Sequence, residues 1–262
     1  MLEKELKASV HTLGCRLNQA ESSIMEKSLE KQGYDLVPFK EESDLVIINT
    51  CTVTAKADSD CRHVIRNYIK RNPDAFVAVV GCYSQMGYKT LAEIPGIDVI
   101  MGNQDKLDIV NYVKLGKNDQ PLILRDRIVR DDFSIEYIGQ SDSKTRANLK
   151  IQDGCDFMCT FCIIPMARGR ARSRDLENLL NEARELASQG FKEIILTGVN
   201  VGTYENSDCG VLEVCDKLNE IDGIERIRIS SIEPTTIPEG LFERMNDKNH
   251  KLVPYLHIPL QS

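Results

Sequence analysis

Three cysteines lie within eight residues of the segment QDGCDFMCTFC, at Cys155, Cys159 and Cys162. A structural zinc site needs four ligands and a disulfide needs two thiols, so three thiols fit neither. Three thiolates do fit a cubic [4Fe–4S] cluster, because they bind three of its irons and leave the fourth iron without a protein ligand. That open iron can bind a cofactor or substrate, and the cluster can pass it an electron. The spacing therefore predicts a redox-active iron–sulfur site.

A second set of three cysteines is spread over the first half of the chain. Cys15 follows VHTLG, Cys51 follows VIINT and Cys82 follows VAVVG, so each comes at the end of an apolar run that reads as a β-strand. The carboxyl ends of parallel strands meet at one edge of a sheet, where ligands of open α/β sheets bind. Three unrelated buried cysteines are the alternative. Because all three cysteines occupy the same position, directly after a predicted strand, we favour a single site that contains all three.

The other three cysteines carry no such pattern. Cys61 and Cys215 lie on apolar helical stripes and are predicted to be small core residues. Cys209 lies in the polar segment SDCG, with no neighbouring ligand type, and is assigned no role.

The elements that position these cysteines follow from the hydrophobic pattern. Short apolar runs alternate with helical patterns in two blocks, which predicts an α/β protein: a flavodoxin-like parallel-sheet domain followed by a partial (β/α) barrel. In the first block the predicted strands are 8–14, 44–50, 75–81 and 97–102, and the predicted helices are 22–33 and 58–73. In the second block the predicted strands are 148–154, 192–198, 225–231 and 254–260, and the predicted helices are 175–190 and 210–223.

These blocks predict two domains. We expect an N-terminal domain at 1–114, a connector at 115–145 with a possible strand at 122–129, and a barrel domain at 146–262. Polar or small residues follow the barrel strands, where the active sites of such barrels form. Asp153 and Gly154 precede the first cysteine of the compact triplet, and Pro259 to Ser262 follow the last predicted strand.

The net charge and the N-terminal sequence limit the partners and the cellular location that can be expected. The formal net charge of −7 argues against nucleic-acid binding over the whole surface, but it allows a local basic patch. Two candidate patches are the run Arg168, Arg170, Arg172, Arg174 and the helical stripe Arg62, Arg66, Lys70, and for each the alternative is a solvated face. The first ten residues, MLEKELKASV, lack the apolar stretch of a signal peptide, and no apolar run approaches about 18 residues. We expect a cytoplasmic protein with no membrane association, and nine cysteines in that reducing compartment favour metal or catalysis over disulfides.

The motifs around both cysteine sets resemble those of a known family. The spacing C-x-x-x-C-x-x-C is that of radical S-adenosylmethionine (SAM) enzymes. TLGCRLNQAES, INTCTVT, VVGCYSQ and LKIQDGCDFMCTFCIIPMARGRARSR together are similar to radical SAM methylthiotransferases, from end to end of the chain. The resemblance makes the barrel a partial radical SAM barrel. It implies that the open iron on the compact triplet binds SAM and that electron transfer yields a 5′-deoxyadenosyl radical.

The resemblance also implies a second cofactor site and further site residues. Cys15, Cys51 and Cys82 would hold a second [4Fe–4S] cluster that presents the inserted sulfur, so the cofactors are two [4Fe–4S] clusters and SAM, with an external reductant and a sulfur donor. The expected SAM contacts are an aromatic residue beside the compact triplet and residues at two strand ends: Phe161, Gly198, Asn200, Ser230, Ser231 and Glu233. For each of these, a strand-end turn role is the alternative. No general base is assigned, with Asp153 and Glu233 as candidates.

Among subfamilies, GCRLNQAES and NTCTVTAKAD are most similar to the MtaB type. This implies methylthiolation of C2 of N6-threonylcarbamoyladenosine at position 37, with the tRNA anticodon loop as partner. The alternatives are isopentenyladenosine in tRNA, an aspartate of ribosomal protein S12, or a non-enzymatic iron–sulfur or zinc module. Met166 departs from the tyrosine that is common in the family. The family also continues with further barrel strands and an RNA-binding TRAM domain beyond the equivalent of Ser262, so we expect a fragment with impaired tRNA affinity and turnover.

Overall fold

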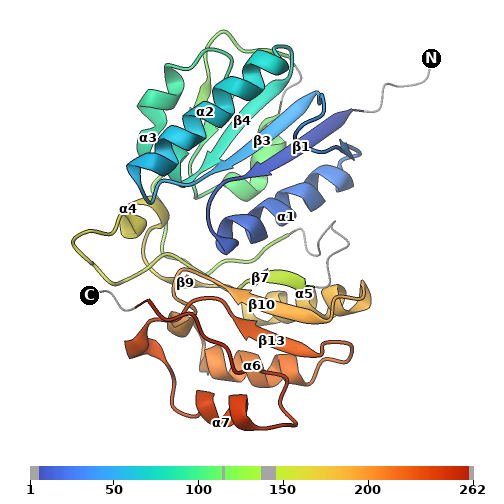
Figure 1. Cartoon of the computed structure of the whole chain (residues 1–262), viewed down its shortest axis with the longest axis vertical. Coiled ribbons are helices and arrows are strands. Elements are labelled where there is room, and N and C mark those ends of the chain that lie inside the picture. The colour runs from blue at the N-terminus through green and yellow to red at the C-terminus, as the bar shows by residue number, and fades with distance from the viewer. Residues whose placement is uncertain (1–5, 114–115, 137–145, 260–262) are drawn as a thin grey trace. The chain divides into compact units, whose positions relative to one another are not determined.

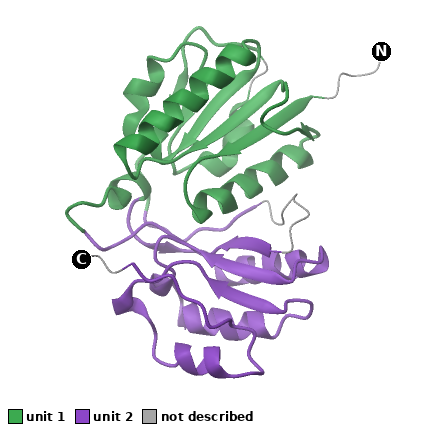
Figure 2. Ribbon diagram, in the orientation of Figure 1, with its two compact units in different colours: residues 1–129, 159–168 green, residues 130–158, 169–262 purple. Residues whose placement is uncertain are grey.

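The computed structural model describes residues 6–113, 116–136 and 146–259. The chain forms two units, one of residues 1–129 with 159–168 and one of residues 130–158 with 169–262 (Figure 2). These bounds differ from the expected 1–114 and 146–262. Strand β6 (Leu122–Leu124), expected in the connector, instead pairs with the sheet of the first unit. Segment 159–168 also belongs to that unit.

The first unit is built on a six-stranded parallel sheet in the order β2-β1-β3-β4-β5-β6 (Figure 1). Its other strands are β1 (Lys7–Thr12), β2 (Asp35–Leu36), β3 (Leu45–Thr50), β4 (Phe76–Gly81) and β5 (Val99–Met101). Every residue of β3 and β4 is buried, which explains their continuous apolar runs, since helices cover both faces of such a sheet. The order 2-1-3-4-5 is that of flavodoxin-like folds, so the predicted class is confirmed.

Helices cover both faces of this sheet. The helices of the first unit are α1 (Arg16–Lys31), α2 (Ala55–Arg71), α3 (Cys82–Ala92), the 3₁₀ helix η1 (Lys106–Tyr112) and the short α4 (Ile164–Arg168). One apolar core contains Ile65 of α2 and Leu91 of α3, and a second contains Met25 of α1 and Ile109 of η1. Helix α1 begins six residues before the predicted start at residue 22. Its first turns bury polar residues such as Asn18, which gave no apolar periodicity.

The second unit contains a three-stranded parallel sheet in the order β13-β10-β7. Its strands are β7 (Arg146–Lys150), β10 (Glu193–Thr197) and β13 (Arg226–Ile229), and its helices are α5 (Leu176–Ser188), α6 (Val211–Asn219) and α7 (Leu241–Asn246). Two short antiparallel pairs join β8 (Gln152–Asp153) to β9 (Arg172–Ser173) and β11 (Glu205–Asn206) to β12 (Cys209–Gly210). The 3₁₀ helices are η2 (Val201–Thr203) and η3 (Pro234–Thr236). This repeated strand–helix pattern is that of a partial barrel. Among the described residues, none of the helices has both the length and the apolar character needed to cross a membrane.

The predicted strand at 254–260 is wrong. Its described residues, 254–259, form no strand, and the residues 260–262 lie outside the described part of the chain. Leu252 makes only an isolated bridge to Ile227. Pro254 and Pro259 lack the N–H group that a strand in this run would donate, which accounts for the failure.

Candidate cluster and cofactor sites

The structure brings Cys15, Cys51 and Cys82 together at the carboxyl edge of the first sheet. They follow β1, β3 and β4, which are neighbours in that sheet. Burial raises the pKa of the Cys51 thiol, backbone hydrogen bonds at Val53 and Thr52 lower it, and negative charge on Cys82 and Cys15 raises it further. Cys15 and Cys82 therefore both lie near Cys51. Cys15 is exposed whereas Cys51 and Cys82 are buried, so the group is open on one side.

The backbone around these thiols leaves little free space. Gly14 has a φ of +108°, and a Cβ atom there would lie 2.7 Å from Cys51 Cβ and 3.0 Å from its Sγ. Only glycine permits this close approach. Among the described residues, no three His, Cys, Asp or Glu side chains lie close enough to hold a single metal ion. Three thiols match the three protein ligands of a [4Fe–4S] cluster with one open iron, whereas a structural zinc site needs four ligands.

A buried polar network lies next to Cys15 and Cys82, and the sequence did not predict it. Arg168 Nη1 donates to Glu21 Oε1 over 2.9 Å, and its Nη2 donates to Asn18 Oδ1 over 2.6 Å. Lys106 Nζ donates to Glu21 Oε2 over 2.5 Å and to Asn103 Oδ1 over 2.7 Å. Asn103 in turn donates to Cys82 Sγ over 3.4 Å. Each residue is polar and isolated in the sequence, so no spacing pattern marked the group.

The interpretation of Arg168, Arg170, Arg172 and Arg174 as one basic patch is wrong for three of its members. Arg168, Arg172 and Arg174 are buried, with exposed fractions of 1%, 8% and 0%. They pair with Glu21, Asp153 and Glu182, respectively, and only the Arg170 side chain is half exposed. The three buried arginines therefore form ion pairs with buried carboxylates and are not available to a nucleic-acid surface.

The basic stripe on α2 is exposed to solvent at two of its three residues. Arg66 and Lys70 are exposed, whereas Arg62 donates to the Tyr83 hydroxyl over 2.5 Å and lies over its ring. The two functions proposed for the stripe, a basic patch or a solvated face, both remain compatible with this arrangement.

The non-ligand cysteines are core residues, as predicted for Cys61 and Cys215. Burial raises the pKa of Cys61 to about 11 and that of Cys215 to about 12. Cys209 is also buried and belongs to the apolar core of the second unit, so its assignment to an isolated polar loop was wrong. Cys209 lies in the short strand β12, which pairs with β11.

The residues of the compact triplet are assigned to different units: Cys155 to the second, and Cys159 and Cys162 to the first. In the second unit, the Cys155 N–H donates to the Gly169 carbonyl over 3.1 Å. In the first unit, the Cys162 N–H donates to the Cys159 carbonyl over 3.0 Å, which forms a turn between two thiols. Cys159 and Cys162 are partly exposed, as ligands of an open cluster would be.

Gln152 joins the ends of two strands in the second unit and was not predicted. Its Oε1 accepts hydrogen bonds from the backbone of Val199 (2.8 Å) and Asn200 (3.1 Å), and its Nε2 donates to the Gly154 carbonyl over 2.8 Å. A Cβ atom at Gly198 would lie 2.7 Å from Gln152 Oε1. The predicted residue Gly198 thus serves a close approach between strand ends, immediately beside the loop that begins at Cys155.

Asn200, Ser231 and Glu233 meet at the carboxyl ends of β10 and β13. Asn200 Oδ1 accepts from the Glu233 N–H over 3.2 Å, and the Val201 N–H donates to the Ser231 carbonyl over 3.0 Å. Asn200 Nδ2 is buried and has no hydrogen-bond partner in the described part of the chain. Leaving such a donor unpaired costs about 1–3 kcal/mol. A ligand with carboxylate or hydroxyl oxygens, such as SAM, would satisfy it.

The other predicted site residues are placed differently. Ser230 is buried and its N–H donates to the Leu196 carbonyl over 3.0 Å, and the Ser231 hydroxyl hydrogen-bonds to His257 Nδ1 over 3.1 Å. Phe161 belongs to the first unit and its side chain is 75% exposed. Asp153 is fully buried and accepts from Lys150 Nζ over 2.7 Å, which favours a structural ion pair over a general base.

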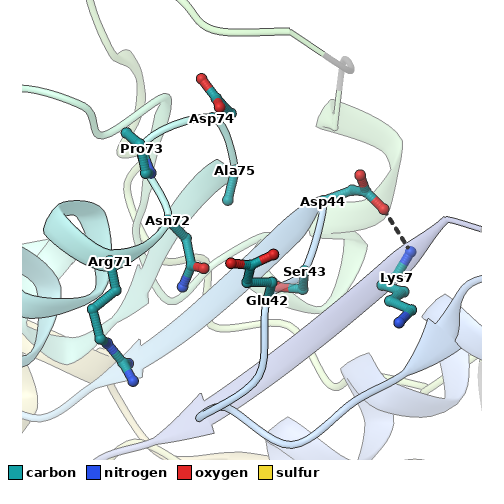
Figure 3. Close-up of a pocket in the computed structure, with 9 residues that line it drawn as sticks. All are labelled: Lys7, Glu42, Ser43, Asp44, Arg71, Asn72, Pro73, Asp74 and Ala75. Atoms are coloured by element: carbon teal, nitrogen blue, oxygen red, sulfur yellow. Dashed lines mark hydrogen bonds between the residues drawn. The ribbon is translucent and has the colours of Figure 1, made fainter.

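A separate cavity of about 480 Å³ lies at the opposite edge of the first sheet (Figure 3). Lys7 at the start of β1, Asp44 before β3 and Ala75 before β4 line it. Because these are the amino ends of the strands, this cavity is distinct from the cysteine edge.

Two sequence models of protein families match this chain. Residues 7–102 match the uncharacterized protein family UPF0004, and residues 149–262 match the radical SAM superfamily. The chain is 39% identical over 261 residues to the threonylcarbamoyladenosine tRNA methylthiotransferase MtaB of Bacillus subtilis, covering 96% of this chain and 57% of that protein. The chain belongs to the radical SAM methylthiotransferase family. Membership implies SAM and an iron–sulfur cluster as cofactors.

Two further relatives are methylthio-transferring tRNA enzymes by name, and one solved structure shares the fold. MtaB of Aquifex aeolicus is 34% identical, with 98% of this chain and 63% of that protein covered. The tRNA-2-methylthio-N(6)-dimethylallyladenosine synthase of Anaplasma phagocytophilum is 32% identical, with 97% and 58% covered. The chain therefore spans about three-fifths of the length of these relatives. The radical SAM methyltransferase TsrM of Kitasatospora setae, solved with cobalamin and a [4Fe–4S] cluster, shares the fold at 16% identity, with a TM-score of 0.59 over 98% of this chain and 61% of that one.

Proposed function

We propose that this chain carries the cluster-binding and SAM-binding part of a tRNA methylthiotransferase that acts on C2 of N6-threonylcarbamoyladenosine at position 37. The observation that carries the proposal is the presence of two cysteine triplets. The members of one triplet, Cys15, Cys51 and Cys82, are far apart in sequence but follow neighbouring strands of one sheet. The identity of 39% to an enzyme named for this nucleoside supports the substrate.

In this proposal each triplet holds one [4Fe–4S] cluster. Cys155, Cys159 and Cys162 bind the cluster that, when present, supplies the electron for reductive cleavage of SAM. Cys15, Cys51 and Cys82 bind the second, where the sulfur to be transferred resides. Because each triplet would supply three ligands, each cluster would keep one iron without a protein ligand, which could bind SAM at one site and sulfur at the other. An external reductant supplies the electron, and a separate sulfur donor restores the sulfur consumed by each turnover.

The residues at the strand ends of the second unit have defined roles toward SAM. The buried Nδ2 of Asn200 donates to an oxygen of the cofactor, and Gly198 leaves room for Gln152, which holds the backbone of Val199 and Asn200 at this site. Ser230, Ser231 and Glu233 offer polar groups at the neighbouring strand end, where ribose hydroxyls need partners. Phe161, exposed beside Cys162, offers a ring for the adenine. The partner is the anticodon loop of tRNA, which places the protein in the cytoplasm.

Metal analysis tests the two-cluster proposal directly. Anaerobic reconstitution of the 262-residue chain should give about eight irons and eight sulfides per chain, and alanine at either complete triplet should leave about four of each. The variant Cys215→Ala is the matched control, because this thiol lies in the apolar core of the second unit, and it should retain all the iron. Zinc alone, or iron loading that Cys15→Ala does not change, would overturn the proposal.

The substrate needs a separate measurement. A second candidate is dimethylallyladenosine (isopentenyladenosine) in tRNA, which the 32% identity to the Anaplasma phagocytophilum synthase favours. Mass analysis of tRNA nucleosides from a deletion strain should show loss of the methylthio group from threonylcarbamoyladenosine and its retention on dimethylallyladenosine. The reverse result would assign the second substrate.

A further inference from the structure

Asn103 lies at the meeting point of Cys82, Lys106 and the segment that follows the compact triplet. It is 3% exposed and follows β5, the strand next to β4 in the first sheet. Its Nδ2 donates to the Ala167 carbonyl over 2.6 Å and to Cys82 Sγ over 3.4 Å. Its backbone N–H donates to Gln85 Oε1 over 3.1 Å. Both hydrogens of the amide and its backbone donor are therefore engaged.

The orientation of this amide is fixed by chemistry. The Lys106 ammonium can only donate, and its Nζ lies 2.7 Å from Asn103 Oδ1. The Ala167 carbonyl can only accept, and it faces Nδ2. A flipped amide would place two donors against Lys106 and two acceptors at Ala167. The group that faces the Cys82 sulfur is thus an N–H donor and not a carbonyl oxygen.

A donor aimed at a thiolate changes what that thiolate does. Hydrogen bonds to the sulfurs of an iron–sulfur cluster stabilise its more negative, reduced state and so raise its reduction potential. They also hold the ligand side chain in one rotamer, as partners of metal ligands commonly do. Asn103 is well suited to both effects, because its own position is held by four hydrogen bonds from distinct parts of the first unit.

We propose that Asn103 is a positioning residue for the cluster on Cys15, Cys51 and Cys82: its Nδ2 hydrogen-bonds to the Cys82 sulfur, fixes that ligand and raises the reduction potential of the cluster. This inference rests on the proposed function, since it requires the second cluster. The same amide also hydrogen-bonds to the carbonyl of Ala167, which lies in helix α4 five residues after Cys162. One side chain thus links the environment of the sulfur-presenting cluster to the segment that carries two ligands of the other.

The test isolates the second cluster in the whole chain. In a parent with alanine at Cys155, Cys159 and Cys162, only the second site can load, and its midpoint potential is measured by redox titration followed by electron paramagnetic resonance. Asn103→Leu removes the donor and should lower the equilibrium constant for reduction about tenfold, a shift of about −59 mV for a one-electron couple. Asn67→Leu is the matched control, because Asn67 is exposed on α2, where its side chain hydrogen-bonds to His63 over 2.8 Å. Its potential should equal that of the parent.

A second variant guards against loss of folding. Asn103→Asp keeps the size of the side chain and an acceptor for Lys106, but it replaces the donor at Cys82 with an oxygen. It should shift the potential in the same direction and further than Asn103→Leu, because it adds negative charge. Circular dichroism establishes that each variant is folded.

The outcomes separate the two proposals. A parent that loads no iron overturns the second cluster and this inference with it. A parent that loads a cluster whose potential is unchanged by Asn103→Asp, and by Asn103→Leu where that variant folds, overturns the inference alone. A negative shift in the Asn103 variants without one in Asn67→Leu supports it.

Discussion

Gly14 shows how a residue without chemistry of its own sets up a site for three thiols. Its φ of +108° and the 2.7 Å that would separate a Cβ atom from Cys51 Cβ leave no room for a side chain. Strained backbone of this kind costs about 1–3 kcal/mol in a residue other than glycine. We predict that Gly14→Ala destabilises the first unit by at least that amount and lowers the iron bound at Cys15, Cys51 and Cys82. Urea unfolding and iron analysis measure the two effects.

Gly33 provides the control for this prediction. It also has a positive φ, +86°, but nothing lies within 4 Å of a Cβ atom built on it. Gly33→Ala should therefore cost about 1 kcal/mol from the backbone alone and leave the iron content unchanged. Equal iron loss in both variants would show that packing against Cys51 is unimportant.

At the scale of elements, the central strands were predictable and the polar turns were not. Strands β3 and β4 are buried on both faces, so their sequences are continuous apolar runs. These runs predicted the ends of both strands to within one or two residues. The first turns of α1 bury polar residues such as Glu21, whose partners come from residues 106 and 168. No local pattern records a partner that distant, so the helix start was misplaced.

The same distinction holds for the candidate site. Six cysteines could be found from spacing and from their place after strands, because thiols are uncommon and their chemistry is narrow. Gln152 and Asn103 could not, because a single amide in a sequence is compatible with a loop, a cap or a surface. Their importance comes from the backbone groups and sulfur that the fold brings to them.

The three parallel strands of the second unit share one buried carboxylate. Glu193 of β10 pairs with Arg146 of β7 (3.4 Å) and with Arg226 (3.1 Å) and Arg228 (2.7 Å) of β13. Burial alone would raise the pKa of Glu193, but the hydrogen bonds from Arg228 and Arg226 outweigh it, so the pKa is lowered. The ionised carboxylate therefore stabilises the folded sheet.

This arrangement predicts a pH dependence of stability. Because the folded pKa lies below the unfolded value of about 4.3, the stabilisation is complete above that pH and is lost as pH falls through the folded pKa. We predict that Glu193→Gln lowers the free energy of unfolding by about 2 kcal/mol at pH 7. The difference from the wild type should shrink below about pH 4, as followed by urea unfolding.

Glu225 is the matched control for Glu193. Its side chain is 55% exposed and pairs with Lys192 over 3.4 Å and with Arg226 over 3.5 Å, so Glu225→Gln should change the stability by less than about 0.5 kcal/mol. A Glu193→Gln variant whose deficit does not depend on pH would show that packing, and not ionisation, is what the carboxylate contributes.

At the scale of the whole molecule, most of the arginines that follow the compact triplet are buried in ion pairs. Three of the four arginines in ARGRARSR form buried ion pairs, so the run supports the fold and presents only Arg170 to solvent. The formal net charge of the chain is −7, and Arg66 and Lys70 on α2 are among its exposed basic residues. Arg168 and Arg170 are therefore expected to differ sharply in their effect on stability.

We predict that Arg168→Met destabilises the first unit by about 3–5 kcal/mol, because it leaves Glu21 buried with one cationic partner fewer. The Arg168 side chain is 1% exposed and Glu21 is fully buried, so water cannot replace the lost contacts. Urea unfolding measures the loss, and proteolysis between Phe157 and Phe161 should quicken as segment 159–168 loses its attachment to the unit. Arg170→Met is the control: its side chain is 50% exposed and lies 3.7 Å from Asp156, so it should cost less than about 1 kcal/mol. Equal stability of the two variants would mean that the buried pair does not hold this segment in place.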